Sequence, residues 1–282
     1  MPPQTQKVNP SFNIQAPKIY TESAKLVIEA GPMGISFTIL NTGDCFQAVV
    51  MYSFPNKLTE AEVNEELQEI LRTEPLLKKQ YKDIHLIWGY PEAVLVPPQF
   101  FEKENSAAML NLVFGDTGNA VLHHDFLYKH NLHNVYRVPQ PASDIMENIF
   151  PAVQQSHQYS LLVDRVMKGG NQLFVLFYTG SLTAMLCKEG KLQAIQNFTY
   201  NTPDDIVFHL LNICRAFEAA PDTVRLCLSG MVDKRSNLYA AVYKYFLDIE
   251  FNSIPANFTI AEELKSSPPH FFSHLFYQAI CV

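Results

Sequence analysis

The sequence predicts a two-lobed α/β fold with mixed sheets, in which each lobe is built on the same β-β-β-α-β unit. The first observation is a succession of three strand-like runs, a capped helix and a short apolar strand within residues 24–89. The second is that the same succession recurs within residues 171–230. The third is that the last strand of each copy ends in glycine, at Gly89 and at Gly230. A repeat of this kind predicts an internally duplicated protein.

Each copy begins with three short strands joined by tight turns. In the first copy, the runs 25–29, 35–40 and 45–54 mix apolar and polar residues over short stretches, and glycine-containing turns at 31–34 and 41–44 separate them. Alternating runs bounded by Gly, Asn and Asp are typical of consecutive hairpins. The second copy repeats the pattern with runs 172–178, 181–188 and 191–199 and with turns at 179–180 and 189–190.

A helix with a recognisable start follows each set of strands. Thr59 and Glu62 form a capping box, in which each side chain binds a backbone amide of the first helical turn. Thr202 is a cap residue followed by Pro203 at the first helical position, and acids follow near the positive end of the helix dipole. Between the two copies, Ser143 is expected to cap a further short helix over 143–149.

Length and charge limit the classes of function. The chain has 282 residues and a net charge of −7, without a basic stripe, which disfavours nucleic acid as a partner. No run approaches the ~18 apolar residues of a membrane span. We expect residues 1–20 to form a flexible N-terminal arm, 21–150 the first lobe and 151–282 the second lobe.

The cysteine pattern predicts a reduced, cytoplasmic protein. There are five cysteines, an odd number, and none is part of a CxxC motif. Each lies in an apolar stretch, so we expect reduced thiols that are largely buried. The alternative is a catalytic cysteine that pairs with a distant histidine. The five residues are Cys45, Cys187, Cys214, Cys227 and Cys281.

Several short motifs carry a further likeness. They are His157 with Tyr159–Leu162, the run Leu192–Tyr200 leading to Asp204 and Asp205, and Pro269–Phe272 with Cys281. In these segments the sequence resembles an uncharacterised bacterial family whose members are similar to the actin-like proteins of pilus assembly. The resemblance covers about residues 20–282. It implies a divergent member of the actin, sugar-kinase and heat-shock ATPase superfamily, with its duplicated actin-like (ribonuclease-H-like) two-lobed fold.

The resemblance also implies where a nucleotide would bind. Active members hold magnesium and phosphate with an acid and small polar residues on the first hairpin, and with glycine turns whose amides cradle the phosphates. The matching positions are Glu29, Gly31 and Gly34 on the first hairpin, Gly180 on the second hairpin and Gly230 after the last strand. These five residues are the expected cofactor-binding set if the protein binds Mg-ATP.

The same loops also carry features that disfavour nucleotide binding. Pro32 removes an amide donor from the first turn, and Met33 stands where a hydroxyl residue is expected. Phe177 lies where the second hairpin would carry its carboxylate. Glycine makes up 11 of 282 residues, about 4% against a usual ~7%. We therefore expect these glycines to serve hairpin geometry, and we expect no resident cofactor.

Residues 123–133 contain the densest set of potential metal ligands. Adjacent residues of a strand point to opposite faces of the sheet, and the spacing of these ligands matches no closed zinc site. We therefore interpret the segment as a solvated strand and turn, and predict no metal or catalytic residue. The potential ligands are His123, His124, Asp125, His130 and His133.

These observations favour a non-catalytic cytoplasmic protein with a degenerate ATPase fold that acts as a protein-interaction module. The sequence does not identify its protein partner. One alternative is an ATP-binding protein or weak ATPase that uses Glu29 and the glycine turns. Another is an enzyme built on an unrelated α/β fold.

Overall fold

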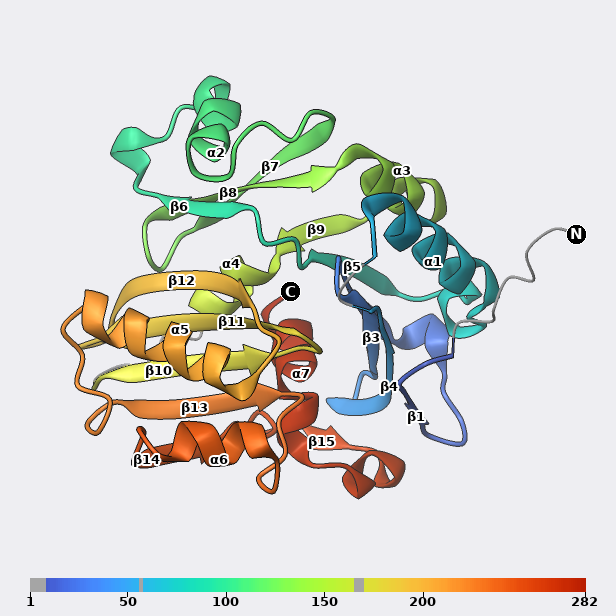
Figure 1. The fold of residues 1–282 in the computed structure, drawn as a ribbon. Coiled ribbons are helices and arrows are strands. Elements are labelled where there is room, and N and C mark those ends of the chain that lie inside the picture. The colour runs from blue at the N-terminus through green and yellow to red at the C-terminus, as the bar shows by residue number, and fades with distance from the viewer. Residues whose placement is uncertain (1–8, 56–57, 165–169) are drawn as a thin grey trace, which may run out of the picture.

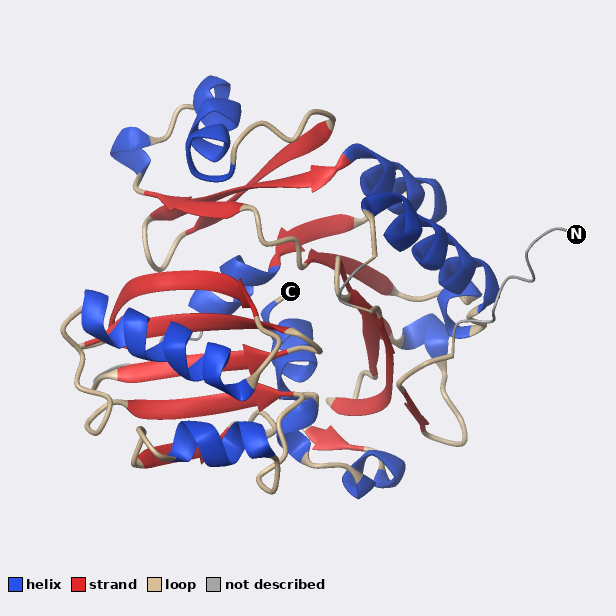
Figure 2. Ribbon diagram, viewed as in Figure 1, coloured by secondary structure: helices blue, strands red, loops and turns tan. Residues whose placement is uncertain are grey.

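Two mixed sheets lie side by side and carry the two predicted lobes (Figure 1). The computed structural model describes residues 9–55, 58–164 and 170–282. A third, three-stranded sheet lies beyond the first two, at the top of the view (Figure 2). The predicted α/β class with mixed sheets is confirmed.

The first sheet has the strand order β1-β4-β3-β2-β5-β9, and β15 pairs with the first two residues of β4, beyond the stretch that pairs with β1. Strands β2, β3 and β4 are antiparallel neighbours, whereas β5 runs parallel to β2. The strands are β1 (Phe12–Gln15), β2 (Lys25–Gly31), β3 (Gly34–Leu40), β4 (Cys45–Ser53), β5 (Asp83–Trp88), β9 (Gln154–His157) and β15 (Thr259–Ile260).

The second sheet has the strand order β12-β11-β10-β13-β14. Its first four strands repeat the order and directions of β4-β3-β2-β5, with two antiparallel pairs followed by a parallel pair. The strands are β10 (Gln172–Phe177), β11 (Ser181–Lys188), β12 (Lys191–Thr199), β13 (Arg225–Gly230) and β14 (Asp248–Phe251).

The hairpins of the two units match residue by residue. Gly31 pairs with Gly34 across the first two-residue turn. In the second hairpin the Tyr178 amide donates to the Ser181 carbonyl, again across two residues. Tyr178 therefore occupies the position of Gly31, and Ser181 that of Gly34. The origin of both units in one duplication stays a proposal.

Helices cover both faces of the first sheet. Alternate β2 residues such as Leu26 and Ile28 pack toward α1 (Glu60–Thr73) and α3 (Gln140–Ile149). Val27 points to the opposite face, where α7 (Ser273–Cys281) packs. Glu29 lies two residues after Val27 in β2, so its side chain points to the same face of the sheet. The Glu29 carboxylate therefore faces α7, between the lobes.

The second sheet is covered on its outer face by two helices, α5 (Pro203–Ala216) and α6 (Asn237–Tyr243). The short helix α4 (Gln158–Val163) follows β9 and buries Leu162 and Val163 against the opposite face. Helix α7 contacts β2 and β3 of the first sheet as well as β13 of the second. It therefore ties the two lobes together.

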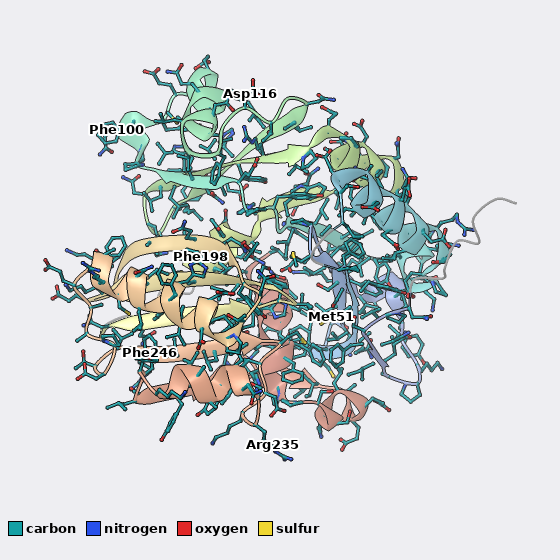
Figure 3. The ribbon with its side chains drawn as sticks, viewed as in Figure 1. Met51, Phe100, Asp116, Phe198, Arg235 and Phe246 are labelled. Atoms are coloured by element: carbon teal, nitrogen blue, oxygen red, sulfur yellow. The ribbon has the colours of Figure 1, made fainter. Side chains whose placement is uncertain are left out.

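The third sheet has the order β6-β8-β7 and carries helix α2. Phe100 and Asp116 lie at the outer end of this part of the molecule (Figure 3). Its elements are β6 (Ala93–Val96), α2 (Ser106–Phe114), β7 (Ala120–Leu127) and β8 (Leu132–Pro139). The 3-10 turns of the described chain are Thr21–Ser23, Leu76–Lys78, Pro98–Phe100, Lys103–Asn105, Glu262–Ser266 and Pro269–Phe271.

Both predicted helix starts are confirmed. The Thr59 hydroxyl accepts from the Glu62 amide at 3.3 Å, and the Glu62 carboxylate accepts from the Thr59 amide at 2.7 Å. Thr202 and Asp205 make the same reciprocal pair, at 3.3 and 2.8 Å. Two of the orphan amides of each helix are thereby satisfied.

Replacing Thr59 or Thr202 by alanine should lower the free energy of unfolding by about 0.5–2 kcal/mol each, because a helix amide loses its acceptor. Equilibrium denaturation would measure the change. Thr117→Ala, in an exposed loop, is the matched control and should leave the midpoint within error. Unchanged midpoints for both cap variants would contradict the assigned helix starts.

Two expectations about single residues are wrong. Ser143 does not cap a helix, because α3 begins at Gln140 directly after β8, and this places Ser143 inside the helix and buried. Cys281 is exposed in the last turn of α7, although Cys187 and Cys214 are buried as expected. None of the five cysteines forms a disulfide within the described residues.

The structure adds detail to the predicted domain limits. Within the expected flexible arm, residues 12–15 form β1, which pairs with β4; residues 1–8 lie outside the described part. β9 and β15 belong to the first sheet although both follow residue 150. The boundaries themselves stay a prediction. None of the described helices combines the length and apolar composition needed to cross a bilayer.

Candidate functional site

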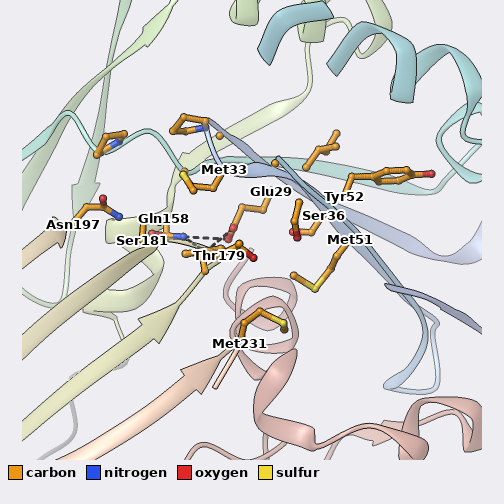
Figure 4. A pocket seen from close by; sticks show the side chains of 18 of the residues that line it. Glu29, Met33, Ser36, Met51, Tyr52, Gln158, Thr179, Ser181, Asn197 and Met231 are labelled. Atoms are coloured by element: carbon orange, nitrogen blue, oxygen red, sulfur yellow. Dashed lines mark hydrogen bonds between the residues drawn. The ribbon is translucent and has the colours of Figure 1, made fainter. Parts of the chain in front are cut away.

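A cavity of about 190 Å³ lies between the two lobes (Figure 4). Of the five predicted residues, the first hairpin brings Glu29, Gly31 and Gly34 to its wall. Gly180 and Gly230 do not line it, although their sequence neighbours do. The structure therefore brings together three of the five predicted residues.

The Glu29 carboxylate is bound by side chains from three other elements. The Tyr178 hydroxyl, directly after β10, donates to Oε1 at 2.6 Å. The Gln278 amide on α7 donates to Oε2, and the Gln158 amide at the start of α4 approaches the same oxygen at 3.4 Å. Both carboxylate oxygens are thus occupied by donors of the chain itself.

These donors continue into the second lobe. Asn197 on β12 donates to the Thr183 hydroxyl, which donates to the Gln158 carbonyl oxygen, each at 3.2 Å. The Gln158 amide also donates to the Tyr178 hydroxyl, which in turn donates to Glu29. Every donor in the series points toward the carboxylate, an order in which hydrogen bonds polarise and strengthen one another.

Burial is the dominant electrostatic influence on this group. It raises the pKa of Glu29, and the hydrogen bonds from Gln278, Tyr178 and Gln158 oppose that rise. Burial, together with the neighbouring Glu29 carboxylate, raises the pKa of Tyr178 well above its usual value. The tyrosine therefore stays a proton donor to Glu29 throughout the neutral range.

The glycines of the predicted set approach backbone rather than open space. Gly34 has φ +143°, and a Cβ there would lie 2.0 Å from the Tyr52 carbonyl oxygen. Gly230 has φ +81°, and its Cβ would lie 2.1 Å from the Phe177 carbonyl oxygen. Both are close contacts between neighbouring strands, so the geometry of the chain requires glycine at these two positions.

The residues around the cavity do not fit Mg-ATP. Both Glu29 oxygens already accept hydrogen bonds from the chain, so a magnesium ion would have to compete with these donors for the carboxylate. No lysine or arginine is among the described residues that line the cavity, so a triphosphate would meet no cation. A cavity of 190 Å³ is also smaller than the ~300–1,000 Å³ typical of sites for drug-sized ligands.

Phe177 does not occupy the position predicted for it. Its side chain is fully buried in the core of the second lobe, on the side of α5. Tyr178, the next residue, faces Glu29 instead. The sequence signal that could have found it is the alternation of β10, because a core-facing Phe177 turns its neighbour toward the other face.

Sequence reasoning also missed a buried polar cluster behind the third sheet. Asp125 accepts from the Ser160 hydroxyl at 2.6 Å, from the His157 amide at 2.8 Å and from the Tyr136 hydroxyl at 3.3 Å. Burial raises the pKa of Asp125, and these hydrogen bonds lower it. Asp125 is therefore a partly buried structural acceptor, and the interpretation of this residue as solvated is wrong.

His157 is held in one tautomer. Its Nδ1 accepts from the Tyr159 amide at 3.1 Å, so Nε2 carries the proton that is donated to the Tyr90 carbonyl at 2.7 Å. Both ring nitrogens are therefore engaged, and the Ser160 hydroxyl points to Asp125 rather than to the imidazole. The group lacks the nucleophile–base pair of a Ser-His-Asp site.

The histidine rings of residues 123–133 pack against neighbouring aromatic rings and do not converge on a common point where a metal ion could bind. The Phe101 ring lies 3.8 Å from that of His133, and the His124 and His133 rings are 6.1 Å apart. The His123 ring stacks on Tyr136 at 5.2 Å. Among the described residues, no group of three His, Cys, Asp or Glu side chains is placed to hold a metal ion.

The sequence matches a family model over residues 15–249, described as "Protein of unknown function (DUF3822)". The chain belongs to this family. No curated protein matches this DUF3822 member. The family has no stated function, so this membership confirms the predicted kinship with an uncharacterised family and assigns no activity.

Solved structures show the fold of the DUF3822 chain. A Bacteroides thetaiotaomicron protein, described as having an actin-like ATPase fold and unknown function, is 16% identical; the match covers 93% of this chain and 97% of that one, with a TM-score of 0.76. A chain of the PilM–PilN type IV pilus biogenesis complex is 12% identical. That match covers 91% of this chain and 98% of the other, with a TM-score of 0.62. The actin-like fold is confirmed, and the alternative of an unrelated fold is wrong.

Proposed function

We propose that this DUF3822 protein is a non-catalytic interaction module whose actin-like fold has a degenerate nucleotide site. One observation carries the proposal: Glu29, the acid expected to hold magnesium, is bound by Tyr178, Gln158 and Gln278. These three donors come from the second hairpin, from α4 and from α7. The chain fills its own metal-binding position, and a site without metal-held phosphates does not support phosphoryl transfer.

A protein partner is the second part of the proposal. The PilM–PilN structure is a complex between proteins, and one of its chains has the fold of this chain. An actin-like fold without nucleotide chemistry keeps a broad two-lobed surface on which a partner can dock. The proposal also includes a cytoplasmic location, because the five cysteines lie in apolar stretches of the sequence and are expected to be reduced.

Isothermal titration calorimetry with Mg-ATP tests the proposal. The purified protein should show no saturable heat, and phosphate release should not exceed the rate of the buffer blank. The reason is that magnesium would have to compete with Tyr178 and Gln278 for Glu29, and no lysine or arginine among the described residues of the cavity wall would compensate the triphosphate charge.

Glu29→Ala is the matched control, because it removes the carboxylate on which any magnesium site would depend. The proposal predicts no saturable heat when Mg-ATP is titrated into either the wild type or this variant. Micromolar Mg-ATP binding by the wild type that disappears in Glu29→Ala would contradict it, and would establish the protein as an ATP-binding protein or weak ATPase.

A further inference from the structure

We propose that the cavity between the lobes binds a small uncharged molecule, about one ring of apolar surface that carries a hydroxyl or amide group. The proposal rests on the proposed function, because it requires that the cavity does not serve a nucleotide. It is carried by the chemistry of the cavity wall, by the cavity volume and by one buried hydroxyl.

The accessible surface of the wall is mostly apolar, and its methionine side chains are adaptable. Three methionines reach it from separate segments: Met33 in the first turn, Met51 on β4 and Met231 after β13 (Figure 4). Ile35 and Pro91 add further apolar surface. Methionine side chains are unbranched and polarisable, so they adjust to the shape of a ligand and make favourable contacts with aromatic rings.

The charge of the wall selects an uncharged ligand. Glu29 is the only acid among the described lining residues, and no lysine or arginine accompanies it. An anion would therefore approach a carboxylate without any cationic partner. A cation would have to compete with the three donors that already hold Glu29. Desolvating either ion inside an apolar cavity is costly, whereas a neutral molecule avoids this cost.

The volume sets the size of the ligand. An apolar cavity of roughly 150 Å³ accommodates benzene. The cavity of about 190 Å³ described here is slightly larger. One six-membered ring with a single small substituent therefore matches this volume, whereas a nucleoside triphosphate would extend well beyond it.

A buried hydroxyl supplies the polar contact. The Ser181 Oγ, on the cavity wall at the start of β11, is inaccessible to water and makes no hydrogen bond to the described residues. Ser181 occupies the position of Gly34 in the matched hairpin. Buried polar groups are nearly always satisfied, so we infer that the adaptable methionine wall moves to admit a ligand group that donates or accepts one hydrogen bond at Ser181.

Benzyl alcohol is a suitable probe, and methyl-¹³C-labelled methionine gives a local readout by NMR. The Met33, Met51 and Met231 methyl resonances should shift saturably with benzyl alcohol, while that of Met109 on α2 should not. Benzoate and benzylamine, with the same ring and opposite charges, should bind at least about tenfold more weakly because each must be desolvated.

Two substitutions test the two ends of the ligand. Ser181→Ala should weaken benzyl alcohol binding by about 3- to 10-fold and leave toluene binding unchanged, because only the alcohol uses the hydroxyl. Met33→Trp should fill the cavity and abolish the shifts. Met109→Trp is the matched control and should preserve them.

Several results would overturn the inference. They are the absence of saturable shifts up to the solubility of benzyl alcohol, shifts confined to methionines outside the cavity, and benzoate binding as tight as that of the alcohol. If these occur while Mg-ATP also fails to bind, the proposed function stands and only this inference falls. Displacement of benzyl alcohol by Mg-ATP would overturn both.

Discussion

Replacing Gly34 or Gly230 by alanine should lower the free energy of unfolding by more than about 3 kcal/mol, or prevent folding. Both glycines have positive φ, +143° and +81°, which L-residues rarely adopt. In addition, the new Cβ atoms would lie 2.0 and 2.1 Å from backbone carbonyl oxygens of neighbouring strands. A rigid backbone oxygen cannot move aside as a flexible side chain can, so the strands themselves must separate.

Gly118→Ala is the matched control for these two variants. Its φ is +76°, but nothing lies within 4 Å of the added Cβ. It should cost only about 1–2 kcal/mol, the strain of the left-handed conformation alone. Chemical denaturation, or soluble yield where a variant does not fold, distinguishes the two cases. Wild-type stability of Gly34→Ala and Gly230→Ala would contradict the packing role and return these glycines to the list of candidate phosphate-binding residues.

The second large effect is a loss of stability in acid that arises from His157. Burial lowers the pKa of His157 to about 4, although its hydrogen bond to the Tyr90 carbonyl acts in the opposite direction. The unfolded chain, with a pKa near 6.5, therefore binds a proton that the folded protein excludes. The stability conferred by neutral His157 is complete above about pH 6.5 and is lost as the pH falls through 4.

The expected magnitude is about 2 kcal/mol by pH 5 and about 3 kcal/mol below pH 4. Urea denaturation of the wild type and of His157→Gln at pH 8, 6 and 5 would measure it. At pH 8 the imidazole is neutral in the folded and the unfolded chain, so the difference in free energy of unfolding between wild type and variant measures only the lost packing and the lost cap of α4. Between pH 8 and 5 the wild type should lose stability more steeply than the variant. Parallel stability curves would contradict the assignment of this proton to His157.

Local sequence signals predicted the elements that depend on neighbours in the chain. The capping boxes at Thr59 and Thr202 each need only four consecutive residues, and the hairpins depend on short turns, so all were recognisable. Ser143 was misplaced because Pro141 is tolerated in the first turn of α3, and the helix therefore starts earlier than its best cap residue.

The candidate site could be predicted only in part. Glu29 and its hairpin were found because they lie together in the sequence. Its partners were not, because Tyr178 and Gln278 are 149 and 249 residues away from Glu29. Nothing local marks a glutamine on a C-terminal helix as the donor to a carboxylate on the first strand of the repeated unit. Such a contact follows from the packing of α7 between the lobes.

The position of α7 has a consequence for synthesis of the protein on the ribosome. Val27 and Ile87, on one face of the first sheet, are covered by Leu275 and Phe276. Strand β4 likewise receives its partner β15 only at residues 259–260. Strands β2 to β5 thus leave one apolar face uncovered while the 184 residues between Trp88 and Ser273 are translated. We expect a nascent chain halted before residue 259 to bind chaperones that recognise exposed apolar surface, and to be released once α7 emerges.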